Sequence, residues 1–235
     1  MRKKNRVLLK ISGEALMGET KSIHDNLKIH HICNDIKEVC DLGYELCLVI
    51  GGGNICRGSS LEESGIHRVS ADHMGMLSTV INAIAIKSKL EDKGLFSGVM
   101  SAIPIPTVAE QYIREKAIRC LEKNKIVIFA SGTGNPFFTT DTGAVLKSIE
   151  MNCSIVLKGT QVDGVYSKDP QKNIAAVKYI DLSYKDVINK NISIMDNTAI
   201  ALAYDNKMPI KIFSIRKSNE LAKVLQNKGS YTTIK

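Results

Sequence analysis

The chain has 235 residues, a formal net charge of +8 and an apolar content of 44%. A chain of this length buries roughly 70% of its unfolded surface, so its core needs no disulfide or metal, which excludes a cross-linked mini-protein. The charged fraction of 24%, without any biased tract, excludes an intrinsically disordered chain.

The positive charge leaves nucleic acid, anionic membranes and phosphorylated small molecules as partner classes. Nucleic acid is not expected as the main partner, because the lysines are scattered and tryptophan and RNP-like aromatic runs are absent. No signal-peptide pattern precedes Val7, and no apolar run approaches the roughly 18 residues of a membrane span. Six cysteines without a CxxC pair favour reduced thiols. We therefore expect a soluble cytoplasmic protein.

Short apolar runs alternate with amphipathic stretches along the chain. The runs predicted as strands are 6–11, 45–50, 95–100, 126–130, 154–157 and 210–214. The stretches predicted as helices lie near 26–42, 70–92, 107–123, 140–151 and 196–206. Asp25 is expected to cap the first helix and Gly43 to end it, and Thr107 with Glu110 forms a capping box for the third. This alternation predicts an α/β fold with a mostly parallel sheet, in a single domain spanning 1–235.

Glycine-containing loops follow four of the predicted strands, at 10–13, 51–54, 131–136 and 158–160. Because ligands bind at the carboxyl ends of strands in an open parallel sheet, the four loops are expected to face one crevice. Glycine lets backbone N–H groups approach a phosphate closely, and a following helix N-terminus adds partial positive charge. Each loop alone is equally compatible with a tight turn between a strand and a helix.

The common nucleotide-binding motifs are absent from the sequence. There is no GxxxxGK[ST], no GxGxxG followed by an acid about 20 residues on, and no protein-kinase signature. What remains are two lysines at strand ends, Lys10 and Lys158, with Arg57 in a loop and Asp141 opening a helix. Cations and backbone donors with few acid–base groups are typical of phosphoryl transfer.

Six segments resemble the bacterial uridylate (UMP) kinases of the amino-acid kinase family, in order along essentially the whole chain. They are KISGEAL at 10–16, GGGNICRG at 51–58, DHMGM at 72–76, SAIP at 101–104, GTGNPFFTTD at 132–141 and VDGV at 162–165. The first two are shared across the family, whereas DHMGM and GTGNPFFTTD narrow the resemblance to UMP kinases. It implies a three-layer αβα sandwich, phosphoryl transfer from ATP to UMP in pyrimidine nucleotide biosynthesis, and Mg²⁺ accompanying ATP.

The resemblance also implies roles for individual residues, with UMP features mainly in 52–140 and ATP-nucleoside features mainly in 158–170. The implied catalytic residues are Lys10, Asp141, Lys158 and Asp196. Those implied for ATP are Lys10, Ile11, Ser12, Gly13, Gly53, Arg57, Thr160, Tyr166 and Asp169. Those implied for UMP are Gly52, Asp72, Thr133, Gly134, Asn135, Pro136, Phe137, Phe138, Thr139 and Thr140. No protein ligand for a metal is implied.

Elementary chemistry agrees with several of these roles. Lysines supply mobile charge that can follow a transferring phosphoryl group, and the acceptor phosphate, with a second pKa near ~6, is already ionised at neutral pH. Asp141 is therefore expected to orient or neutralise a lysine rather than act as a base, and Asp196 resembles an acid that positions a lysine. Alternatively, Asp72 and Asp141 sit in first helical turns for the helix dipole alone. Thr139 and Thr140 are equally suited to capping the next helix.

Assembly and regulation follow only from the resemblance, which implies a homohexamer and inhibition by UTP at the UMP site. The segment 18–25 departs from the family pattern, so the resemblance gives no support for activation by GTP. The apolar face of the helix near 70–92 (Met74, Leu77, Ile81 and Ile84) suits either a subunit interface or the core. His24, His30 and His31 are expected at the surface.

Two other functions remain open at this point. One is a carboxylate kinase of the same fold, which would form an acyl phosphate. The other is a non-catalytic nucleotide sensor or DNA-binding regulator that uses the positive charge.

Overall fold

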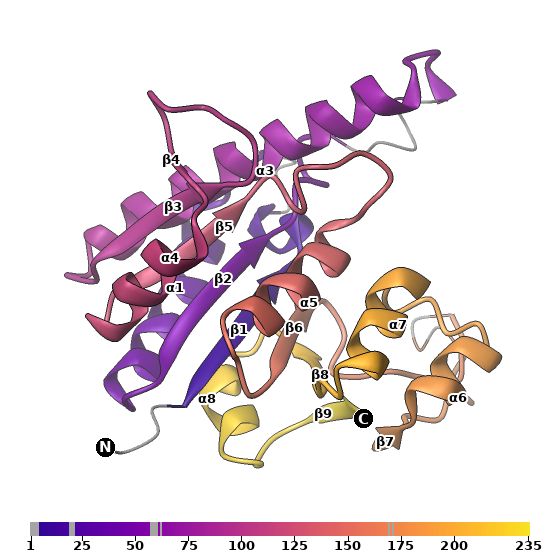
Figure 1. Cartoon of the computed structure of the whole chain (residues 1–235). Coiled ribbons are helices and arrows are strands. Elements are labelled where there is room, and N and C mark those ends of the chain that lie inside the picture. The colour runs from indigo at the N-terminus through magenta and orange to yellow at the C-terminus, as the bar shows by residue number, and fades with distance from the viewer. Residues whose placement is uncertain (1–4, 19–21, 57–60, 62, 169, 171) are drawn as a thin grey trace.

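The predicted strands belong to one sheet in the computed structural model, which describes residues 5–18, 22–56, 61, 63–168, 170 and 172–235 (Figure 1). Within these residues nine strands lie in the order β4-β3-β5-β2-β1-β6-β8-β9-β7. Their bounds are β1 Arg6–Ile11, β2 Glu45–Ile50, β3 Ser97–Ser101, β4 Glu110–Gln111, β5 Ile126–Ala130, β6 Val156–Thr160, β7 Asp181–Leu182, β8 Ile210–Ser214 and β9 Tyr231–Ile234. Neighbouring strands are parallel except for the antiparallel pair β8 and β9, which confirms the mostly parallel sheet.

Helices cover both faces of this sheet (Figure 1). They are η1 Gly13–Leu16, α1 Asn26–Asp41, α3 Arg68–Glu91, α4 Arg114–Glu122, α5 Thr140–Glu150, α6 Tyr184–Asn189, α7 Asn197–Asp205 and α8 Glu220–Leu225. Side chains alternate across a strand, so β1 buries Leu9 with α1, α3 and α8 on one face and Leu8 with α4, α5, α6 and α7 on the other. The expected three-layer αβα architecture is confirmed.

The ends of α1 follow the predicted chemistry. The Asp25 side chain accepts hydrogen bonds from the backbone N–H groups of Leu27 and Lys28. Gly43 follows the helix with a φ of +87°, a left-handed conformation that glycine adopts without a steric penalty. Both predictions for this helix are confirmed.

The helix predicted over 107–123 is wrong in its first half. Residues 105–109 form turns, Glu110–Gln111 pairs with β3 as β4, and α4 begins only at Arg114. The capping box of Thr107 with Glu110 is therefore absent, because Glu110 belongs to an edge strand. The fifth predicted strand is shifted as well, since β6 begins at Val156 and continues through Lys158 to Thr160.

The apolar helix α3 is long and apolar enough, by length and composition alone, to cross a membrane. The core helix of an α/β fold meets the same criterion, and here Ala83, Ile86 and Leu90 are fully buried against the sheet. The position of α3 in one of the three layers therefore accounts for its composition.

Candidate functional site

Two lysines and an aspartate form a buried cluster at the carboxyl ends of the central strands. Lys10 on β1 and Lys158 on β6 are register partners in adjacent parallel strands. Lys10 lies two residues after Leu8 on its strand, and Lys158 lies two residues after Val156, so both lysines point to the same face of the sheet as those side chains. This is the face covered by the layer that contains α5. Asp141, in the first turn of α5, lies 2.7 Å from Lys10 Nζ through Oδ1 and 2.6 Å from Lys158 Nζ through Oδ2. One carboxylate thus joins two ammonium groups that the sheet places side by side.

The charges of this cluster shift the pKa values of its members. Burial by itself would raise the pKa of Asp141, but the positive charges of Lys10 and Lys158 outweigh it and the pKa is lowered. Burial lowers the pKa of Lys158, and the negative charge of Asp141 opposes that shift. Asp141 therefore stays ionised and is a poor proton acceptor.

Asp196 holds the loop before α7 close to this cluster, and among the described residues its carboxylate makes no hydrogen bond to either lysine. Its carboxylate caps α7 through the N–H of Ala199 and accepts hydrogen bonds from the hydroxyl groups of Thr139 and Thr142. The preceding loop supplies the carbonyl of Ile194, which accepts a hydrogen bond from Lys158 Nζ. The expected role in lysine positioning is consistent with this indirect arrangement.

The first two glycine loops need glycine because they pack against each other and against α3. A Cβ on Gly13 would lie 2.5 Å from Asn54 Oδ1 and 2.7 Å from the carbonyl oxygen of Gly51. A Cβ on Gly52 would lie 2.8 Å from the carbonyl oxygen of Gly75 in α3. Close packing is therefore a second reason for glycine at these positions. The first, predicted from the sequence, is that glycine lets backbone N–H groups approach a phosphate.

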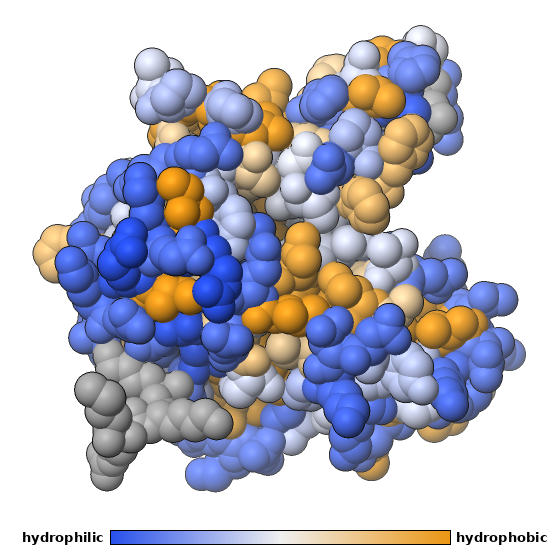
Figure 2. Space-filling model, viewed as in Figure 1, coloured by the Kyte–Doolittle hydropathy of each residue, from blue (hydrophilic) through white to orange (hydrophobic). Residues whose placement is uncertain are grey.

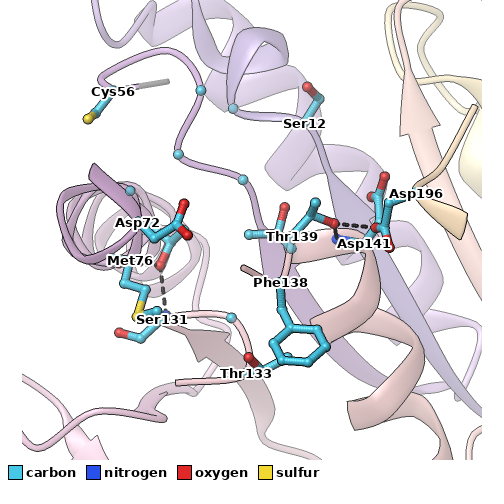
Figure 3. A pocket seen from close by; sticks show the side chains of 18 of the residues that line it. Ser12, Cys56, Asp72, Met76, Ser131, Thr133, Phe138, Thr139, Asp141 and Asp196 are labelled. Atoms are coloured by element: carbon cyan, nitrogen blue, oxygen red, sulfur yellow. Dashed lines mark hydrogen bonds between the residues drawn. The ribbon is translucent and has the colours of Figure 1, made fainter. Parts of the chain in front are cut away.

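The first three glycine loops line a cleft of about 480 Å³ together with Lys10 and Asp141. The fourth loop does not reach it, and Lys158 lines a neighbouring hollow instead. A second hollow of about 760 Å³ shares Ser12, Glu14, Asp141 and Asp196 with it and extends over residues 191–197. The surface is hollowed between the part built by α3 and the part built by α6 and α7 (Figure 2). Asp72 and Met76 lie on one side of the cleft, and Thr139, Asp141 and Asp196 on the other (Figure 3).

Asp72 ties α3 to the loop between β5 and α5. Its Oδ2 accepts hydrogen bonds from the backbone N–H of Phe137 at 2.7 Å and from Arg68 Nε at 2.9 Å. The Arg68 guanidinium also lies 5.2 Å from the centre of the Phe137 ring. Since α3 begins at Arg68, Asp72 lies beyond its first turn, and the helix-dipole interpretation is wrong for this residue. Asp141 does lie in the first turn of α5, so it interacts favourably with the helix dipole and also forms the two ion pairs.

Most of the residues implied for UMP line the cleft: Gly52, Asp72, Thr133, Asn135, Phe138, Thr139 and Thr140. Gly134, Pro136 and Phe137 belong to the same loop without lining the cleft. Thr139 also caps α5 by accepting hydrogen bonds from two backbone N–H groups, so the capping alternative is confirmed for it.

The residues implied for ATP are brought together only in part. Lys10, Ser12, Gly13 and Gly53 line the cleft, whereas the Ile11 side chain is fully buried in the core. Thr160 is buried and bonds to the backbone of Val162, and the Tyr166 hydroxyl donates to Asp163 at 2.7 Å. Arg57 and Asp169 lie outside the described residues.

Two polar residues behind the cleft were missed by the sequence interpretation. His30 and His31 are exposed as expected, and His24 is half-buried. His24 Nε2 lies 2.7 Å from Oδ1 of Asn82, which is fully buried in α3. A single asparagine within a largely apolar helix was the signal that could have drawn attention to this position.

The described residues do not provide a protein-built metal site. They contain no group of three or more His, Cys, Asp or Glu side chains that could hold an ion, and Asp141 is already engaged by two lysines. They therefore do not fit a resident metal. An ion that arrives with a nucleotide is held mainly by phosphate oxygens.

A parallel α/β sheet that presents glycine loops and paired lysines at its carboxyl edge defines a phosphate-binding class of protein. The chain belongs to the amino acid kinase family, whose profile matches residues 5–214. It is 56% identical over 232 residues to a uridylate kinase of Rickettsia typhi, covering 99% of this chain and 95% of that protein.

Two solved structures are similar over nearly the whole chain. The UMP kinase from Ureaplasma parvum has a TM-score of 0.94 at 36% identity, covering 100% of this chain and 99% of that one. The UMP kinase from Bacillus anthracis has a TM-score of 0.94 at 41% identity, covering 99% and 96%. These similarities confirm the α/β fold and agree with the resemblance on which the residue roles rest.

Proposed function

We propose that this chain transfers the γ-phosphoryl group of ATP to UMP, forming ADP and UDP. The observation that carries the proposal is the Lys10–Asp141–Lys158 cluster at a glycine-lined cleft, in a chain similar to uridylate kinases over 99% of its length. The chain is an ATP-dependent phosphotransferase, and we propose that all 235 residues form one amino acid kinase domain.

Catalysis in this cleft consists of alignment and charge neutralisation. The acceptor is a phosphate oxygen that is already ionised at neutral pH, so no proton has to be removed from it. Lys10 and Lys158 offset the negative charge on the transferring group, as cationic clamps do in phosphoryl transfer. Asp141 lies 2.7 Å from the Lys10 ammonium group and 2.6 Å from that of Lys158, and so holds the two groups close together.

The two nucleotides meet at Asp141. We assign UMP to the side of the 480 Å³ cleft that is lined by Asp72 and the loop around Thr133 and Phe138. The ATP phosphates are assigned to its opposite side, at Ser12, Gly13 and Gly53. Thr160 and Tyr166, with Arg57 and Asp169, remain our proposal for ATP contacts on the basis of resemblance. Mg²⁺ is expected to enter with ATP, held mainly by the phosphate oxygens of the nucleotide.

A coupled ADP-release assay tests this assignment with UMP, CMP, dUMP and N-acetylglutamate as acceptors. We expect UMP to exceed each alternative in kcat/KM by about tenfold or more. The reason is the missing 2′-hydroxyl for dUMP, the different hydrogen-bonding edge of the base for CMP, and the missing phosphate for N-acetylglutamate. Turnover only with N-acetylglutamate would establish the carboxylate kinase instead. DNA affinity that falls steeply with salt, without any turnover, would establish the regulator.

Asp72→Asn is expected to raise the KM for UMP about tenfold, because a neutral amide replaces a charge-assisted acceptor for the ribose hydroxyls. The amide oxygen can still accept the Phe137 N–H, so the loop stays in place. The KM for ATP should change less than about twofold. His73→Asn is the matched control, because His73 is the exposed neighbour of Asp72 and its replacement should leave the KM for UMP unchanged. If Asp72→Asn also leaves the KM for UMP unchanged, Asp72 does not bind UMP and serves only to anchor the loop.

We also propose that the chain forms a homo-oligomer, and the family resemblance implies a hexamer. Met74, Leu77, Ile81 and Ile84 form a stripe along α3, each 40–49% exposed, so assignment of these side chains to the core is wrong. Their spacing of three and four residues is that of a helix–helix seam. The α3 helix of a second copy is the occupant that fits this stripe.

Leu77→Glu should therefore lower the assembled mass measured by light scattering after size-exclusion chromatography, because a charge cannot be buried in that seam without a large cost. Leu27→Glu is the control, since Leu27 is 73% exposed and belongs to a different helix, α1. Equal masses for the wild type and Leu77→Glu would rule out α3 as the contact.

We place this activity in pyrimidine nucleotide biosynthesis in the cytoplasm, in keeping with six free cysteines. Inhibition by UTP at the UMP site is part of the same proposal. It would be measured as inhibition competitive with UMP.

A further inference from the structure

Asn82 lies directly behind the triple-glycine loop and is fully buried. Its Nδ2 donates to the carbonyl oxygen of Gly51 at 2.7 Å and to Asn54 Oδ1 at 2.7 Å. Its Oδ1 accepts from Asn54 Nδ2 at 3.1 Å and contacts His24 Nε2 at 2.7 Å. A primary amide has two N–H donors and two acceptor positions, and all four are used here.

The Asn54 side chain continues this network toward the two loops at the cleft. Its Nδ2 also donates to the carbonyl oxygen of Ile23 at 2.8 Å. Asn54 Oδ1 lies where a Cβ on Gly13 would come within 2.5 Å, so it packs against the first glycine loop. The pair of asparagines therefore connects the segment before α1, both glycine loops and α3. Neither asparagine lines the cleft.

The Gly51 residue is held from two sides. Its N–H donates to the Ile11 carbonyl at 2.9 Å, and its carbonyl accepts from Asn82. In a planar trans peptide the carbonyl of one residue and the N–H of the next point in opposite directions. Drawing the Gly51 carbonyl toward Asn82 therefore turns the Gly52 N–H away from Asn82. Glycine peptides rotate easily, so without such an anchor the orientation would not be fixed.

We infer that Asn82 is a positioning residue that fixes the Gly51–Gly52 peptide, so that the Gly52 N–H is presented to an anionic phosphate in the cleft. Asn54 and His24 complete its hydrogen bonds. This inference rests on the proposed phosphotransferase function. A backbone N–H that is already oriented toward the phosphate stabilises negative charge without having to reorient during the reaction.

Asn82→Asp is the informative variant, because it keeps the volume of the side chain but removes the N–H donor to Gly51. We expect kcat for UDP formation at pH 8 to fall about tenfold or more, since small misplacements of positioning groups have effects of this size. The variant is made in a His24→Gln background, with His24→Gln alone as its reference, because the imidazole 2.7 Å from this side chain would otherwise form an ion pair with the new carboxylate. A buried carboxyl without such a partner has a raised pKa, and its protonated form can again donate to the Gly51 carbonyl. The ratio of kcat between the variant and its reference should therefore rise as the pH is lowered from 8 to 6.

The same rise is not expected from a purely structural defect, provided that circular dichroism shows the same folded fraction at both pH values. Ser78→Ala is the control, because Ser78 is buried one turn away in α3. Among the described residues, its hydroxyl bonds only to the Met74 carbonyl within the same helix. Its kcat should stay within about twofold of the wild type at every pH.

A folded Asn82→Asp variant whose kcat at pH 8 equals that of its His24→Gln reference, or whose ratio to this reference does not change with pH, overturns the inference. If that variant does not fold, Asn54→Asp takes its place, because Asn54 is only partly buried and loses the donor to Asn82 Oδ1. Wild-type kcat in folded Asn54→Asp would then overturn the inference. Absence of UMP turnover in the wild type would instead refute the proposed function, and amide exchange at Gly52 would still test the anchor.

Discussion

Lys10→Ala is expected to lower kcat by about 10²- to 10³-fold, the range found when one preorganised electrostatic contact is removed from an active site. The Lys10 ammonium lies 2.7 Å from Asp141 and its side chain is 9% exposed, so water does not replace its charge efficiently. Asp141 keeps Lys158 as a partner, and the fold should persist. The KM for UMP should change much less than kcat, measured by the ADP-release assay.

Lys211→Met is a matched control for Lys10→Ala. Lys211 is another buried strand lysine, on β8, but its Nζ donates to the Val224 carbonyl and to Asn227 at the end of α8. The control should lower Tm while kcat remains near the wild-type value. Turnover by Lys10→Ala at the wild-type rate would contradict both the assigned role of Lys10 and the proposed charge neutralisation.

Asp141→Asn should lower kcat by about 100-fold, with smaller changes in both KM values, because two ammonium groups lose the charge that holds them together. The variant also predicts a pH effect on stability. The pKa of Asp141 is lowered in the folded state, so its stabilising contribution is present above the unfolded pKa of roughly 3.9 and is lost as the pH falls toward the folded value. The stability difference between wild type and variant should therefore shrink below about pH 4.

Urea unfolding between pH 7 and pH 3 measures this difference, and Asp35→Asn provides a control of opposite sign. Burial raises the pKa of Asp35, which lies on α1 in the other helical layer. Ionising Asp35 as the pH rises above about 4 therefore costs stability in the wild type, and Asp35→Asn should gain relative to it. Equal losses of kcat and substrate binding in Asp141→Asn would indicate a folding role.

Local sequence patterns were sufficient for much of the architecture. Apolar runs marked β1, β2, β5 and β8 to the residue, because strands buried on both faces are continuous apolar segments. The start of α1 was equally local, since Asp25 bonds to N–H groups only two and three residues away.

Other elements depended on contacts that are distant in sequence. Residues 107–113 have a helical pattern, yet Glu110–Gln111 pairs with β3, and an edge pairing of this kind is decided by the sheet. The short C-terminal strand β9 runs antiparallel to β8 and was not predicted. Two- and four-residue strands have too little periodicity to be distinguished from loops.

The sequence by itself determined the chemistry of the cleft: which strands end in glycine loops, and that two lysines and an acid lie near those ends. Only the tertiary structure decided that β1 and β6 are neighbours in a register that sets Lys10 beside Lys158, with Asp141 joining them. It likewise decided that Asn82 holds Gly51 from behind, 31 residues away in the chain. Strand order and burial are set by packing of the whole chain, and no local pattern encodes which distant groups that packing brings within hydrogen-bonding distance.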